Sequence, residues 1–264
     1  MSSGDVKLFA FGDEETGLGE GGLRELGELH ASPFPRLFLE RRNELTRELR
    51  EALGDLQVHR AFFMDSEVIV RRGPCMPASC LLIRGMVLRR HYDMPGDGVV
   101  SALGVPGDFI DLHSFLLDRL DHDVVSVGRT VVEFVDHDIL SKLVIEHPHL
   151  MRALWRETLV DAKTHRAWIV ARAALRAAPR VAHLLCEIEV RLRRVGLADS
   201  GNFTMPLDQK RVADVLGFSA VHVNRAIQDL RADALVSWEG RSVHFLDHDA
   251  LRRFAAFDEA YLMP

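Results

Sequence analysis

The apolar residues of this chain recur first at helical spacing, then in short β-prone runs, and then at helical spacing again. Between residues 39 and 56, leucines recur at helical spacing among Arg and Glu, which predicts an amphipathic helix. Turn-forming residues such as Gly85 separate the β-prone runs that follow. These runs are residues 68–70, 80–83, 86–88, 99–105, 124–127 and 131–135. Many short strands at this spacing predict an antiparallel sandwich or roll.

Helical spacing returns from about residue 138 to residue 178 and is interrupted at His147–Pro148. After this break, a narrow stripe recurs at alternating intervals of four and three residues, which is typical of a coiled-coil seam. The stripe consists of Met151, Trp155, Thr158, Ala162, His165 and Ile169. We expect this helix to pair with its copy in a second subunit; the alternative is that it packs on its own domain alone. Within the stripe, His165 is interpreted as a polar residue that fixes the register, or as a pH- or haem-linked switch.

Residues 207–230 predict two short helices joined by a tight turn. Asp208 and Ser219 are residues that cap the first turn of a helix, and Gly217 stands where a left-handed residue ends the first helix. Apolar residues at helical spacing are expected to hold the two helices together: Val212, Ala213, Leu216, Val223, Ile227 and Leu230. This arrangement is the helix-turn-helix unit.

The second of these helices has an outward face that starts in its first turn. This face consists of Val221, His222, Asn224, Arg225 and Gln228. At the start of a recognition helix, Arg reaches guanine, Asn or Gln reaches adenine, and an apolar group contacts the thymine methyl. Residues 235–245 then alternate as a hairpin with its turn near Glu239–Gly240, which predicts a wing beside the DNA backbone. The alternative is a small-molecule or redox-responsive switch whose winged helix contacts a protein partner instead of DNA.

These patterns give an α+β fold class and four segments. Residues 1–34 form an acidic, Gly-rich tail, which we expect to be mobile because it can bury little apolar surface. Residues 35–138 contain a leading helix and the antiparallel β-roll, residues 139–178 the long dimerisation helix region, and residues 179–264 the winged helix-turn-helix.

Charge and composition change this picture little. The net charge is −6, but residues 1–35 hold seven acidic and two basic residues, so the rest of the chain carries only −1. A nearly neutral body is compatible with DNA binding, which needs a local cluster of donors. With no apolar run of about 18 residues and no signal-like N-terminus, we expect neither a membrane span nor secretion. Three cysteines without framework spacing favour a reducing compartment, so we expect a cytoplasmic protein.

From about residue 60 to the C-terminus, the chain resembles the CRP/FNR superfamily of bacterial transcription regulators. The order of a β-roll, a long dimer helix and a winged helix-turn-helix matches that superfamily. Residues 106–110 match locally in the roll, as do Gly217–Ser219 and Val223–Arg225 in the helix-turn-helix. Residues 111–117 and 221–225 resemble a branch that is common in alphaproteobacteria.

The resemblance implies a homodimer that binds double-stranded DNA at a palindromic site, with RNA polymerase as a further partner. It gives the base-reading positions to Val221, Asn224 and Arg225, and the phosphate-contacting positions to Gln209, Ser219 and His222. Val221 departs from the family, because many members carry Glu there. The consensus half-site of those members is therefore not expected here.

The resemblance also implies a sensor roll, and the residues that bind a cyclic nucleotide in other members differ here. Where such members hold the ribose with a Glu, this chain has Leu112. Where an Arg followed by Ser or Thr holds the phosphate, it has Leu120–Asp121, close to Arg119 and among carboxylates that repel a phosphate. We therefore expect no ordinary cAMP response, and the effector is unknown.

Other cofactors have weak support in the sequence. An iron–sulfur cluster needs about four thiolates, and the chain has three cysteines, none before residue 75. Cys75 and Cys80 are a candidate redox pair, or else a loop residue and a buried strand residue. Asp118, Asp121, His122 and Asp123, like His147 and His149, lack the spacing of a metal site and are interpreted as solvated loop or cap residues. We therefore expect no metal and no cofactor. We also expect no catalytic residue, because the nucleophile-elbow, phosphate-loop and zincin motifs are missing.

Overall fold

The protein is described by a computed structural model, which covers residues 51–53, 56–92 and 98–263. The predicted acidic tail over residues 1–34 and nearly all of the helix predicted between residues 39 and 56 lie outside the described residues. Among the helices in the described ranges, none combines the length and the apolar character that crossing a bilayer requires.

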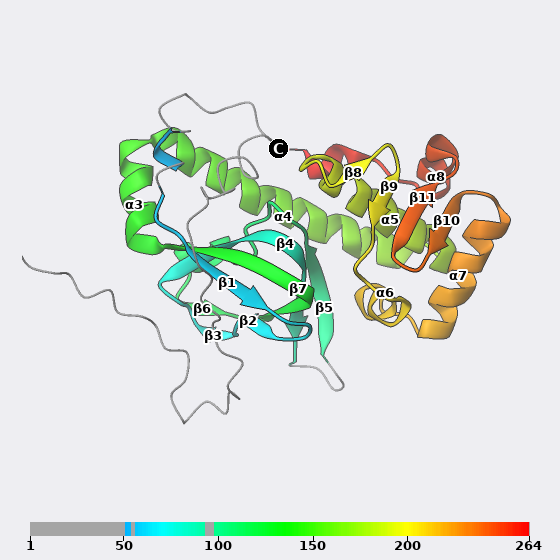
Figure 1. Cartoon of the computed structure of the whole chain (residues 1–264), viewed down its shortest axis with the longest axis horizontal. Helices are drawn as coiled ribbons and strands as arrows, with labels where there is room; N and C mark the ends of the chain where they lie inside the picture. Colours follow the sequence, from blue (N-terminus) through cyan, green and yellow to red (C-terminus); the bar gives the residue numbers. More distant parts are fainter. Residues whose placement is uncertain (1–50, 54–55, 93–97, 264) are drawn as a thin grey trace, which may run out of the picture.

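Two long antiparallel strands, β4 (Ala78–His91) and β7 (Asp123–Asp136), form the centre of the N-terminal roll. The main sheet has the order β1-β7-β4-β5, and β2 also pairs with β7 (Figure 1). The shorter strands are β1 (His59–Phe63), β2 (Val68–Val70), β3 (Gly73–Pro74), β5 (Val99–Gly104) and β6 (Arg119–Leu120). The predicted antiparallel roll is therefore confirmed.

The long strands correct one detail of the sequence prediction. The runs 80–83 and 86–88 were expected as two strands, but they belong to β4, and the runs 124–127 and 131–135 both belong to β7. The reason lies at Gly85 and Gly128, which have φ of 92° and 66°. The pairing of β4 with β7 shifts register on both sides of Arg84. Here glycine forms a bulge that bends the strand, and the strand continues past it.

Three helices lead from the roll to the C-terminal domain (Figure 1). They are α3 (His137–Glu146), α4 (Pro148–Ala174) and α5 (Ala177–Arg193). The predicted break at His147–Pro148 is confirmed, because α4 begins at the proline. The end of the helical stretch was expected near residue 178, but the second break lies at residues 175–176 and α5 already begins at Ala177. Pro179 lies in the first turn of α5, where its missing N–H leaves no helical hydrogen bond unmade.

The C-terminal domain has a four-stranded antiparallel sheet of order β10-β11-β9-β8 with helices around it. Its elements are β8 (Ala198–Asp199), β9 (Asn202–Thr204), α6 (Gln209–Leu216), α7 (Ala220–Ala232), β10 (Val236–Glu239), β11 (Ser242–Phe245), α8 (His248–Phe254) and η2 (Glu259–Leu262). One apolar cluster runs from Leu88 and Val100 of the roll through α5 into this domain. With the roll, the long helices and the winged helix-turn-helix, the predicted α+β fold class is confirmed.

A buried carboxylate joins the roll to the C-terminal half. Glu187 on α5 has no solvent exposure, and its Oε2 accepts hydrogen bonds from Trp168 Nε1 (2.8 Å) and from Tyr261 Oη (2.7 Å). Its Oε1 accepts from Arg191 Nη1 at 2.9 Å, and Arg191 Nη2 reaches Asp108 Oδ2 of the roll at 2.6 Å. Burial alone lowers the pKa of the Arg191 guanidinium, but the carboxylates of Asp108 and Glu187 more than offset it and the pKa is raised. This network therefore holds α4, α5, η2 and the roll together.

We expect Glu187→Ala to lower the free energy of unfolding by about 3–5 kcal/mol, because it leaves buried charge and hydrogen-bond donors without this carboxylate. Urea denaturation followed by far-UV circular dichroism measures the loss. Glu239→Ala, at an exposed position of the wing, is the matched control and should change stability by less than about 0.5 kcal/mol. Equal stability of the two variants would contradict the role assigned to the network.

Candidate nucleic-acid interface

Helices α6 and α7 are delimited by the residues that the sequence suggested. Asp208 accepts a hydrogen bond from Arg211 N at 2.8 Å and caps α6, and Gly217 ends it in the left-handed region with φ of 70°. The Ser219 hydroxyl caps α7 by accepting from His222 N at 3.4 Å. The predicted caps and the predicted glycine turn are confirmed, so the chain builds a helix-turn-helix locally.

The apolar faces of these two helices are buried against each other and the domain core. All six residues expected to face inward are at most 6% exposed: Val212, Ala213, Leu216, Val223, Ile227 and Leu230. Burial of this face fixes the rotation of α7 about its axis, because the apolar positions recur on one side. The side chains on the opposite side of α7 therefore point away from the protein.

The three residues predicted to read bases all lie on this outward face. Val221 is 78% exposed, and Asn224 and Arg225 are exposed as well. Asn224 Nδ2 donates to Gln209 Oε1 of α6 at 2.9 Å. Arg225 makes no hydrogen bond or ion pair with the part of the chain that the structure describes. Its guanidinium is therefore available for a bidentate contact with an external acceptor.

The residues predicted to contact phosphates lie beside this face. Gln209 starts α6, and Ser219 and His222 lie at the start of α7, all of them exposed. Ser219 Oγ and His222 Nδ1 are 2.8 Å apart, so a hydrogen bond orients the imidazole. These hydroxyl, amide and imidazole groups are donors that suit phosphate oxygens.

The hairpin expected after α7 is present as β10 and β11. Glu239 pairs with Ser242 in the antiparallel register, and Gly240 has φ of 57°, so the predicted turn near Glu239–Gly240 is confirmed. Trp238 Nε1 donates to Gly240 O at 3.2 Å and holds the tip. Arg241 is exposed at this tip, where a positive charge suits a DNA backbone.

Helix α6 is docked on the roll of the same chain (Figure 1). Arg90 at the end of β4 forms an ion pair of 3.2 Å with Asp214, and Arg211 forms another with Asp65. Arg172 on α4 donates to Val100 O of the roll at 2.9 Å and to Val215 O of α6 at 3.0 Å. These contacts fix the helix-turn-helix relative to the roll, and α7 lies on the far side of α6.

The stripe predicted on α4 is only partly covered by its own chain. Trp155 and Ile169 are 66% and 67% exposed, and Met151, Thr158, Ala162 and His165 are half-buried. Two further apolar residues that were not assigned to the stripe, Leu159 and Val170, are also exposed. The opposite face of α4 is buried in the chain through Leu150, Ala153, Leu154, Trp168 and Ala171. Helix α4 therefore packs on its own domain with one face and keeps a second apolar face outside.

A cavity of about 300 Å³ lies between the roll and α4. Its charged and polar lining includes Arg89, His113, Asp161 and His165, and Arg89 Nη1 is 2.6 Å from Asp161 Oδ2. Burial, together with the nearby charge of Arg89, lowers the pKa of His113 to about 4. Arg89 and Asp161 were not identified as site residues from the sequence. Arg89 directly follows the apolar run 86–88, at a position that proves to be buried, and this placement could have identified it.

The positions that would hold the ribose and phosphate of a cyclic nucleotide carry apolar or solvent-exposed side chains. Leu112 and Leu120 are buried, whereas Arg119 and Asp121 are exposed. The nearby residues Asp118, Asp121, His122 and Asp123 were interpreted as solvated loop or helix-cap residues. That interpretation is wrong for His122 and Asp123, which are 5% and 8% exposed, because the turn into β7 carries them inward.

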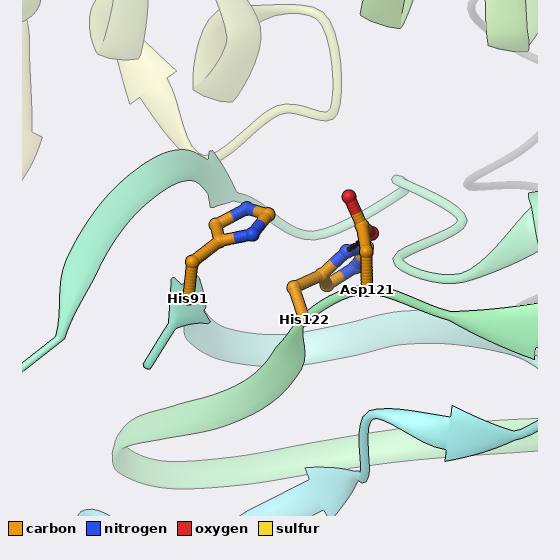
Figure 2. Close-up of side chains that lie close together, drawn as sticks. All are labelled: His91, Asp121 and His122. Carbon is orange, nitrogen blue, oxygen red and sulfur yellow. Dashed lines mark hydrogen bonds and ion pairs between the residues drawn. The ribbon is translucent and has the colours of Figure 1, made fainter. Parts of the chain in front are cut away.

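His122 packs against residues from other parts of the roll. Its ring centroid is 5.5 Å from that of His91 on β4 and 5.1 Å from that of His113. His91, Asp121 and His122 each offer one possible ligand atom, and these atoms lie within 4.8 Å of one another (Figure 2). Among the described residues, this is the one such group of three. His91 was not predicted from the sequence to lie near Asp121 and His122.

The cysteines are free thiols. Cys80 is fully buried in β4 and Cys75 is half-buried between β3 and β4. Burial, together with the charge of Asp111, raises the pKa of the Cys80 thiol well above its usual value. Burial also raises the pKa of the Asp111 carboxyl to about 7, although the carboxyl accepts a hydrogen bond from Cys80 N at 2.6 Å. The geometry favours the interpretation of Cys75 and Cys80 as a loop residue and a buried strand residue.

Comparison with known proteins agrees with this architecture. Residues 179–254 match the model of the Crp-like helix-turn-helix domain. The transcriptional activator protein FnrL of Cereibacter sphaeroides is 29% identical over 192 residues, which cover 72% of this chain and 76% of that protein. FixK2 from Bradyrhizobium japonicum has a similar structure, with a TM-score of 0.69, 20% identity and coverage of 77% of this chain and all of that chain.

A further solved structure has the same fold. It is a transcriptional regulator of the CRP family from Thermus thermophilus, which matches with a TM-score of 0.58 and 20% identity over 74% of this chain and 96% of that chain. The match of the helix-turn-helix model, the similarity to FnrL and the shared fold all agree with the resemblance noted in the sequence. Residues 179–254 therefore belong to the Crp-like helix-turn-helix family, and the described part of the chain shares the fold of CRP-family regulators.

Proposed function

We propose that the protein acts as a homodimer that binds an inverted-repeat DNA site through α7. The observation that carries this proposal is the orientation of α7: its apolar side is buried, and Val221, Asn224 and Arg225 are exposed from its first turns. Recognition helices insert this end into the major groove. Arg225 would bind guanine, Asn224 adenine, and Val221 the methyl group of thymine.

Phosphate contacts would orient α7 in the groove. Gln209, Ser219 and His222 surround its N-terminus and carry donor groups, and the wing adds Arg241. The hydrogen bond between Asn224 and Gln209 connects a base-reading side chain to a phosphate-contacting one. A contact of Gln209 with the DNA backbone would therefore help to hold Asn224 in position to bind a base.

The exposed apolar face of α4 supports the dimer. Trp155, Leu159 and Ile169 are each more than half exposed, and pairing this face with its copy would remove them from water. Two recognition helices would then meet successive major grooves about 34 Å apart, which fits an inverted repeat.

The sensor function is assigned to the roll. A small molecule would occupy the cavity beside α4, where Arg89 and Asp161 supply charge and Trp168 an apolar wall. Leu112 and Leu120–Asp121 do not offer the groups that bind the ribose and phosphate of a cyclic nucleotide, so cAMP is not the proposed effector. We assign the protein to the cytoplasm, with RNA polymerase as its further partner and no enzymatic activity.

Selection of bound sites from random DNA, followed by gel-shift titration, tests the reading of bases. We expect Arg225→Ala to weaken binding to the selected site by about 1–3 kcal/mol and to relax one base position in each half-site. Arg231→Ala is the matched control, because Arg231 is an exposed arginine in the last turn of the same helix. It should leave selectivity unchanged. Unchanged affinity and selectivity in the Arg225 variant would contradict the assignment.

Salt dependence separates DNA binding from docking of the winged helix on a protein. Contacts with about 6–10 phosphates release counterions, so the affinity for the selected fragment should fall by about 10³–10⁵ between 50 and 200 mM salt. The slope is measured from gel shifts at four salt concentrations. A failure to select any sequence, or an affinity that does not change with salt, would refute the DNA-binding proposal.

The dimer is tested at Ile169. We expect Ile169→Lys to convert the dimer to a monomer in sedimentation equilibrium and to abolish tight binding to the inverted repeat, because a charge would be buried in the seam. The control Ile145→Lys changes a 78%-exposed residue on α3, away from the stripe, and should leave the protein dimeric. A dimeric Ile169 variant would mean that another surface carries the association.

A further inference from the structure

We propose that the roll contains a binding site for a first-row divalent transition-metal ion such as Zn²⁺, formed by His91, Asp121 and His122. The three residues come from the end of β4 and from the turn between β6 and β7, and they converge at one edge of the roll (Figure 2). Their three possible ligand atoms lie within 4.8 Å of one another. The site lies in the roll and is separate from the proposed DNA-reading face.

The environment of His122 supplies the independent observation. Its side chain is 6% exposed, and its Nε2 is buried without a hydrogen-bond partner in the part of the chain that the structure describes. A buried polar atom without a partner costs about 1–3 kcal/mol. Coordination of a metal ion would satisfy this atom.

The carboxylate next to His122 orients its imidazole ring. Asp121 Oδ1 lies 2.7 Å from His122 Nδ1. The two ring nitrogens point to opposite sides, so Asp121 must leave this contact in order to bind an ion that is held by Nε2. The charge of Arg89 near His122 is largely compensated, because Arg89 Nη1 pairs with Asp161 Oδ2 at 2.6 Å.

The remaining ligand, His91, is oriented in a similar way. Its Nε2 lies 2.9 Å from Ser101 Oγ on the neighbouring strand β5, which leaves Nδ1 as the second ring nitrogen. In a tetrahedral site with bonds of about 2.1 Å, ligand atoms are roughly 3.4 Å apart. The widest separation between ligand atoms, at most 4.8 Å, must therefore shorten by up to about 1.4 Å. Asp121 has a side chain that is 79% exposed, so it can move and also gives an ion a path from solvent.

The donor set determines the class of ion. Two imidazoles and one carboxylate suit Zn²⁺, Co²⁺, Ni²⁺ or Fe²⁺, whereas Mg²⁺ and Ca²⁺ prefer a shell of oxygen atoms. With three protein ligands, a coordination position stays open for water or a small molecule. His113 packs on His122 at 5.1 Å and also lines the cavity beside α4. An ion at this site would therefore lie one side chain away from the cavity.

Titration of the full chain with Co²⁺, after removal of metal and without a histidine tag, tests the site. Visible d–d absorption reports nitrogen and oxygen ligands, and we expect saturation at one tight equivalent per chain. Asp121→Asn and His91→Ala should each weaken the binding at least tenfold, as judged by competition with a chelator. His149→Ala, at an exposed histidine on α4, is the matched control and should bind as the wild type does.

The two test variants change residues outside the buried core, so they keep the fold where His122→Ala can lose it. Circular dichroism verifies this before each titration. The absence of a saturable Co²⁺ spectrum in the wild type, or equal affinity in the wild type and both test variants, would overturn the proposal. Gel shifts on the same samples measure DNA binding separately from the Co²⁺ titration. A failure of DNA binding is therefore distinguished from a failure of metal binding.

Discussion

The arrangement of the roll and the C-terminal domain depends on the buried charge network around Glu187. This carboxylate lies on α5, and it accepts hydrogen bonds from α4, from η2 and from an arginine that also binds Asp108 of the roll. Buried charges are tolerated where partners surround them, and each of these partners comes from a different segment. The roll and the helix-turn-helix are thus connected by a fixed, directional set of contacts, to which the arginines beneath α6 add further bonds.

Much of the fold followed from local sequence patterns. The caps at Asp208 and Ser219 and the left-handed Gly217 act within a few residues, so their effect can be predicted without knowledge of the tertiary structure. The same holds for the helix break before Pro148. Gly85 was interpreted wrongly as a turn residue, because a glycine between two β-prone runs fits a turn as well as a bulge. Only the register between β4 and β7 distinguishes the two.

The residues of the roll that carry chemistry were harder to find. Arg89 and His91 lie on β4, but their partners Asp161 and His122 lie on α4 and before β7, so their meeting depends on how strands and helices pack. For the helix-turn-helix the situation is different, since all proposed base-reading residues lie within five positions of one helix. A helical period fixes which side chains share a face. Contacts between segments that are far apart leave no such periodic trace, which is why His122 was placed in a solvated loop although it is buried.

Helix α4 lines the cavity with one side and keeps an apolar face outside on another, which has a consequence for signalling. Thr158 and His165 line the cavity between α4 and the roll. Both also belong to the stripe through which we expect α4 to contact the second subunit. A molecule that filled the cavity would touch these two turns of the helix from one side while the second subunit touched them from the other. Sensing and assembly would then share one mechanical element, with no intervening loop or hinge to carry the message.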